Sequence, residues 1–198
     1  MKSLRYVATT GPVLAAMALL PVLSFGAESH PCVSEAPTAQ SYTWNFSQEA
    51  AGLLNDLRAD SAKAESHAAT LESMTAANEV SWESHADQLS QLKTEVDDMG
   101  TKLCRLETIR RVVSPWERKA IDRSAPLVQL LADNTQDAIA YLNRYEARMW
   151  QPTYVKYTDN LYTESRQLTN SVKNFEEYAK ARSKEMKLQK SLELKTGA

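Results

Sequence analysis

The sequence has little glycine, and this shortage narrows the fold. Of its 198 residues only five are glycine, and two of these, Gly11 and Gly26, fall among the first 27 positions. A sheet with tight hairpins normally places glycine at its turns, so the shortage argues against an all-β fold. Alanine, leucine, glutamate, lysine and glutamine are abundant instead, and these residues favour helices. The composition therefore predicts an all-α protein.

Motifs that carry chemistry are missing as well. The sequence contains no glycine-rich phosphate loop, no nucleophile elbow and no HExxH zinc motif. The Cys-x-x-Cys-His motif of attached haem and the Glu-x-x-His motif of di-iron bundles are also absent. The formal net charge is -2 without a basic block, which argues against a nucleic-acid or anionic-lipid ligand. A binding or structural role is therefore expected in preference to an enzyme.

The first 27 residues have the layout of a secretory signal peptide. Lys2 and Arg5 form a short basic start, residues 13–23 are an apolar core, and small residues follow up to Ala27. The apolar run is shorter than the ~20 residues that a membrane span requires, which disfavours the alternative of a retained anchor. We expect cleavage near Ala27, export to the periplasm or the medium, and no integral span in the mature chain.

The mature chain is predicted to begin with an extended arm over residues 28–45, which contains Pro31 and Pro37. A helical bundle domain over 46–192 and a flexible tail over 193–198 follow. Within the domain, apolar residues recur at spacings of three and four, as on one face of a helix. Four such stripes are predicted to be buried: Ala50, Leu54, Leu57, Ala64, Ala68 and Leu71; Trp82, His85, Leu89, Leu92, Val96, Met99, Leu103 and Leu106; Trp116, Ala120, Leu127, Leu131, Ala138, Tyr141 and Tyr145; and Tyr154, Leu161, Leu168, Val172, Phe175, Ala179 and Met186. The breaks in this pattern predict helices near 46–74, 80–112, 116–149 and 153–190.

Four helices of similar length with short connections predict an antiparallel up-down four-helix bundle. One boundary leaves an alternative open, because the heptad phase is continuous from Ala50 to Val113. An unbroken helix there would give a long-helix coiled-coil hairpin or a dimer. The weak helix formers over 75–79 favour a turn at that point. Pro126 falls inside the third stripe and predicts a kink or a late helix start.

The two cysteines, Cys32 and Cys104, are predicted to form a structural disulfide. An even number of cysteines in an exported protein favours a bridge. With a turn near residue 76, Cys104 lies level with the start of the first helix and hence beside the arm. The bridge would fasten the arm to the bundle. Redox chemistry is not expected, because no Cys-x-x-Cys motif occurs.

The histidines give an alternative function, a small metal- or haem-binding bundle. In a hairpin with its turn near 76, His67 and His85 lie at the same level on neighbouring helices, and tyrosines of the later helices fall nearby. Two imidazoles in such surroundings could ligate a transition metal or a haem b iron. An ordinary hydrogen-bonded histidine in a bundle core explains the same pattern. We therefore predict that the protein holds no cofactor, and the alternative is a bound transition metal or haem b.

Tryptophans mark the candidate interface. In the antiparallel bundle, Trp82 and Trp150 fall at one end, and Trp44 and Trp116 fall at the other. Exposed aromatic residues are frequent anchors of protein interfaces. The leading hypothesis is therefore an exported, non-catalytic bundle with a structural role or a role in binding a protein or another cell-envelope component. A homodimer is a further hypothesis for the partner.

Overall fold

A computed structural model describes residues 45–77, 81–146 and 148–196 of the chain. In these ranges the chain forms four helices: α1 (Phe46–Ala77), α2 (Trp82–Ile109), α3 (Pro115–Arg144) and α4 (Pro152–Thr196). The predicted signal peptide and all but the last residue of the predicted arm lie outside the described residues. Their assignment therefore stays a prediction. Among the described helices, none combines the length and the apolar character that a membrane crossing needs.

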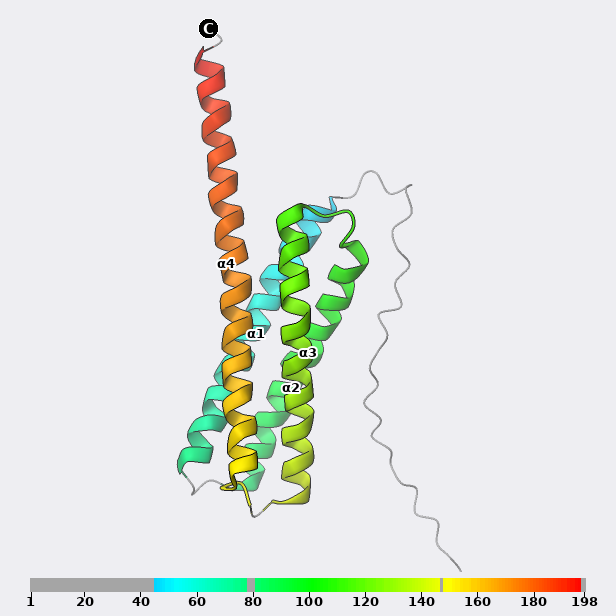
Figure 1. The fold of residues 1–198 in the computed structure, drawn as a ribbon, viewed down its shortest axis with the longest axis vertical. Coiled ribbons are helices and arrows are strands. Elements are labelled where there is room, and N and C mark those ends of the chain that lie inside the picture. The colour runs from blue at the N-terminus through cyan, green and yellow to red at the C-terminus, as the bar shows by residue number, and fades with distance from the viewer. Residues whose placement is uncertain (1–44, 78–80, 147, 197–198) are drawn as a thin grey trace, which may run out of the picture. The chain divides into compact units, whose positions relative to one another are not determined.

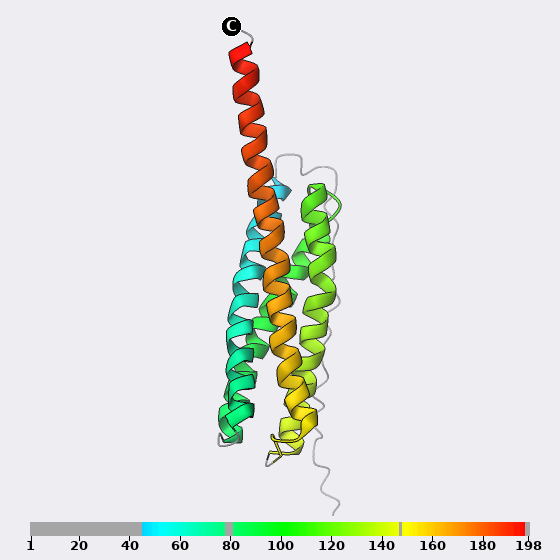
Figure 2. The ribbon, with the colours of Figure 1, turned by 60° about the vertical axis from the view of Figure 1, so that its left-hand side comes forward.

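The helices run alternately up and down and form an antiparallel bundle (Figures 1 and 2). α1 packs against α2 and α4, and α3 packs against the same two helices, so that α1 and α3 are diagonal to each other. α1 ends at Ala77 and α2 begins at Trp82. The predicted four-helix bundle is thus confirmed, and the alternative of one unbroken helix through this region is wrong.

Local sequence explains where the helices begin. Before α1, the side-chain oxygen of Asn45 accepts a hydrogen bond from the backbone N–H of Gln48 at 3.0 Å. Before α2, Ser81 Oγ accepts one from the N–H of Ser84 at 3.4 Å. Before α3, the Glu117 carboxylate accepts one from the N–H of Ser114 at 2.7 Å. Each contact satisfies a backbone donor near a helix start, where α-helices leave such donors unpaired.

The core follows the predicted stripes closely on α1 and α2. Six of its buried residues on α1 are those of the predicted stripe: Ala50, Leu54, Leu57, Ala64, Ala68 and Leu71. On α2 the buried apolar residues are Leu89, Leu92, Val96, Met99, Leu106 and Ile109. Two members of the predicted α2 stripe are not buried, since Trp82 is exposed and Leu103 is half-buried, and Ile109 was not part of that stripe. Burying such side chains away from water is the main force that holds helices of this kind together.

The stripes predicted on α3 and α4 need correction. Leu127 is only half-buried and Tyr145 is exposed, whereas Val128 and Leu142 are buried. The buried face of α3 also includes Ser124 and Thr135, polar residues that an apolar pattern does not reveal. Pro126 lies inside α3 without delaying its start at Pro115. On α4 the predicted stripe extended to Met186, which is in fact exposed.

Polar contacts fix how α4 lies against its neighbours. Thr169 Oγ1 donates a hydrogen bond to Ser61 Oγ of α1 at 3.1 Å, inside the bundle. Asn134 Nδ2 of α3 donates one to the Glu164 carboxylate at 2.6 Å. Because these groups are buried or half-buried, a shift of α4 along the bundle would leave them unpaired, at a cost of about 1–3 kcal/mol each. The contacts therefore set the level at which α4 leaves the bundle.

Candidate functional site

α4 is much longer than the other three helices. It has 45 residues, whereas α1, α2 and α3 have 32, 28 and 30. Among the α4 side chains that the structure describes, which extend to Leu192, the last fully buried one is Val172. The helix then continues past the end of the bundle formed by the other helices (Figures 1 and 2). We call residues 179–196 the α4 extension.

The extension carries large apolar side chains in contact with solvent. Tyr178, at its base, is 51% exposed, Leu188 is 55% exposed and Leu192 is 63% exposed. These three residues lie on one side of the helix with Ala181 and Glu185, at successive spacings of three and four. We call these five residues the extension stripe. The stripe is about 21 Å long at the rise of an α-helix.

The charge of the extension is opposite to that of the bundle. Residues 179–196 contain six Lys or Arg and two Asp or Glu, a net charge of +4. Residues 45–178 contain fifteen Lys or Arg and twenty-one Asp or Glu, a net charge of -6. The mildly acidic total therefore conceals a basic helix that continues beyond an acidic bundle. Arg182 and Lys184, both exposed, flank the extension stripe on its two sides.

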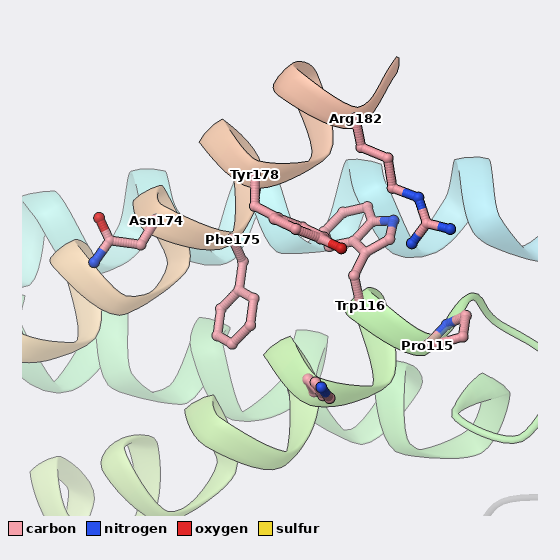
Figure 3. Close-up of a pocket in the computed structure, with 7 residues that line it drawn as sticks. Pro115, Trp116, Asn174, Phe175, Tyr178 and Arg182 are labelled. Atoms are coloured by element: carbon pink, nitrogen blue, oxygen red, sulfur yellow. The ribbon is translucent and has the colours of Figure 1, made fainter. Parts of the chain in front are cut away.

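A groove lies where α4 leaves the bundle, between α3 and α4. It has a volume of about 490 Å³, and we call it the aromatic groove. Its lining residues are Pro115, Trp116, Lys119, Asn174, Phe175, Tyr178 and Arg182. Figure 3 shows Trp116 rising from α3 toward α4, with Tyr178 on one side and Arg182 on the other. Tyr178 belongs both to the groove and to the stripe, so the two form one continuous surface.

The groove offers two kinds of contact at once. The rings of Trp116, Phe175 and Tyr178 provide apolar area, and Lys119 and Arg182 provide positive charge. Such a combination suits a side chain or segment that is apolar and carries an acidic group nearby. Nucleophile and base pairs of the kind used in covalent catalysis are not among its lining residues.

The structure gives each of the two predicted metal-ligating histidines a different neighbour. His85 is buried on α2, and its Nδ1 lies 3.1 Å from the hydroxyl oxygen of Tyr154. His67 is half-buried on α1, and its Nδ1 lies 3.0 Å from Oε1 of Gln88. The described part of the chain contains no cluster of three or more His, Cys, Asp or Glu that could hold a metal ion. A site that uses both histidines stays a prediction.

His85 is part of an aromatic cluster at the end of the bundle opposite the extension. The ring of Tyr154 lies 5.5 Å from that of His85 and 5.6 Å from that of Tyr141. The Tyr141 hydroxyl donates a hydrogen bond to Oε1 of Gln151 at 2.7 Å. Burial lowers the pKa of His85 and raises the pKa of Tyr154, because it disfavours the charged form of each. At neutral pH this cluster is therefore uncharged and fills the end of the core.

The predicted interface tryptophans occupy both ends of the bundle. Trp82 and Trp150 are exposed, Trp150 to 64%, near the ends of the helices that also hold the aromatic cluster. Trp116 lines the aromatic groove at the other end and is half-buried. Trp44 lies outside the described residues. Of the predicted disulfide, Cys104 is half-buried on α2, and Cys32 lies outside the described residues, so the bridge stays a prediction.

Sequence reasoning included Phe175 in the core stripe but missed the groove and the extension as a surface. A signal for them existed in the sequence. The predicted last helix was longer than the others, and the positions that continue its buried stripe, Arg182 and Gln189, are polar. Compared with known proteins, the chain matches no family, no curated protein and no solved structure.

Proposed function

We propose that this protein is exported and acts by binding a partner rather than by catalysis. Its binding surface would be the aromatic groove together with the α4 extension. The observation that carries this proposal is the exposure of Tyr178, Leu188 and Leu192 along one side of a helix that has left its own bundle. Export is supported by the signal-like layout of the first 27 residues.

A surface of this kind is energetically unfavourable as long as no partner covers it. Apolar side chains that line up in water mark interaction sites, whereas exposed apolar residues scattered singly do not. The described side chains of the extension are mostly exposed, whereas the earlier part of α4 is packed in the core. A short helix with little packed against it is marginally stable in water. A partner that covers the stripe would bury the apolar residues and order the helix. Aromatic residues and arginine, which the groove contains, are the residue types that most often dominate binding energy.

Site-specific photo-crosslinking in the producing cell tests this proposal. A benzophenone amino acid replaces Leu192 in the extension stripe, and a matched variant carries it at Leu130, an exposed leucine on α3. We expect one discrete crosslinked product from position 192 and none from position 130. Equal crosslink yields at the two positions would contradict the proposal, and so would the absence of a crosslink at both. The mass of the purified mature chain tests export separately, since cleavage near Ala27 would remove the leader.

A further inference from the structure

We infer that the partner is an acidic amphipathic helix of another protein, which packs along the extension stripe and places its first apolar residue in the aromatic groove. This inference rests on the proposed function and specifies its ligand. It follows from three features of the surface: the width of the apolar stripe, the sign of the flanking charges and the composition of the groove.

The width of the stripe favours a helix as the occupant. Tyr178, Ala181, Glu185, Leu188 and Leu192 follow one another at spacings of three, four, three and four. A stripe of this kind is the narrow seam by which one helix packs on another. A helix that lies in a membrane interface has instead a broad apolar face. Because the stripe is narrow and includes a glutamate, it suits a partner helix better than a lipid surface.

The flanking charges favour an acidic partner. Arg182 and Lys184 border the stripe, and the extension as a whole carries a net charge of +4. In paired helices the residues that border the seam select the partner, and opposite charges there favour association. A second copy of the extension would bring +4 against +4 and would be repelled. Glutamates or aspartates at the corresponding positions of the partner would be attracted.

The groove supplies the anchor at the base of the stripe. Trp116, Phe175 and Tyr178 form an apolar hollow of about 490 Å³, large enough for one bulky side chain and the start of a helix. Lys119 and Arg182 line the same hollow and can pair with a carboxylate close to that side chain. A helix anchored here and running along the stripe would contact surfaces of α3 and α4 together.

Binding of two designed peptides tests the inference on the mature full-length protein. Both peptides have about three heptads with leucine at the seam positions. The acidic probe carries glutamate at the flanking positions, and the basic probe carries lysine there. We expect the acidic probe to bind at least tenfold more tightly by fluorescence anisotropy. Its affinity should fall as salt is raised, because salt screens exposed charges.

Variants of the protein locate the binding surface. The double variant Leu188→Ser with Leu192→Ser should bind the acidic probe at least tenfold more weakly than the wild type. Leu130→Ser on α3 is the matched control, and its affinity for the probe should not change. Lys184→Glu with Arg182→Glu should reverse the preference between the two probes. All of these residues are exposed, so we expect the variants to fold as the wild type does. Their thermal unfolding midpoints check this.

Several outcomes would overturn the inference. Equal affinity for the two probes would show that the charges beside the extension stripe do not select the partner. Undiminished binding of the acidic probe to the double leucine variant would show that the stripe is not its binding surface. Self-association in sedimentation equilibrium that the leucine variant loses would identify a second copy as the occupant. Binding to phosphatidylglycerol vesicles in preference to the acidic probe would identify a membrane. In each case the crosslink from position 192 would still decide whether the extension binds a partner at all.

Discussion

The Nδ1 atom of His85 lies 3.1 Å from the hydroxyl oxygen of Tyr154, although 69 positions separate the two residues in the chain. The contact joins the start of α2 to the start of α4 inside the core, where both side chains are buried. A buried imidazole without a hydrogen-bond partner is costly. The pair therefore helps to fix which helices meet at this end of the bundle.

Removing the hydroxyl should show how much this contact contributes. We expect Tyr154→Phe to lower the free energy of unfolding by about 1–3 kcal/mol, because the ring stays buried while His85 loses its partner. Urea denaturation followed by circular dichroism at pH 8 measures the change. Tyr178→Phe, at an exposed tyrosine, is the matched control and should have almost no effect. Equal effects of the two substitutions would show that the contact contributes nothing.

The same histidine should make the fold sensitive to mild acid. Burial lowers the pKa of His85 in the folded protein below its ordinary value of 6.5. The unfolded chain therefore binds the proton more readily, and stability is lost as the pH falls below 6.5 toward the folded pKa. We expect His85→Asn, which cannot be protonated, to lose less stability than the wild type between pH 6.5 and 5. Parallel pH profiles for the two proteins would contradict this prediction.

Glu164 should give the stability of the fold a pH dependence opposite to that of His85. It is buried on α4, and this burial raises its pKa above the ordinary value of 4.5, although Asn134 donates a hydrogen bond to it. The folded protein therefore holds the proton more tightly, and stability is lost as the pH rises from 4.5 through the folded pKa. Glu164→Gln should gain stability over the wild type across this rise. A difference between the two thermal midpoints that stays constant from pH 4 to 7 would count against a raised pKa.

The fold was largely predictable because the apolar residues of α1 and α2 sit at regular positions. Every residue of the α1 stripe, from Ala50 to Leu71, proved buried. On α3, however, the adjacent apolar residues Leu127 and Val128 both fit a helical spacing. The sequence offered no ground for choosing Val128 as the buried one. The buried Ser124 and Thr135 on that face carried no apolar signal.

The candidate surface was harder to predict, because exposure depends on where the neighbouring helices end. The spacing of Tyr178, Leu188 and Leu192 resembles that of buried residues earlier in α4. What distinguishes them is that α1 begins at Phe46 and α3 at Pro115, so none of the described helices continues beside the extension. That relation between helix ends is a property of the packed bundle, and no local pattern reports it.

A buried carboxylate on α1 gives a further test of the packing. Asp60 is only 6% exposed, and its Oδ2 lies 2.7 Å from Nζ of Lys102 on α2. Lys102→Met would leave this charge in the interface without its closer lysine, and we expect a loss of about 3 kcal/mol in unfolding free energy. Lys93→Met is the control, since its ion pair with Asp97 is exposed and such pairs contribute little. A small change in both variants would mean that water, or Lys63 of α1, compensates for the loss.

Hydrogen exchange should divide α4 into two parts with very different protection. Amides from Leu161 to Val172 lie in the packed part of the helix and should exchange only when the bundle unfolds. The side chains from Met186 to Leu192 are exposed, and an exposed helix opens easily to coil, so these amides should exchange several orders of magnitude faster. Mass spectrometry of peptic fragments measures both rates in the same sample. Adding the acidic probe should slow exchange in the second group and leave the first unchanged, because only the extension gains a neighbour. Slow exchange over Met186–Leu192 without any probe would show that the extension is already covered, and the exposed stripe would then not be a free binding surface.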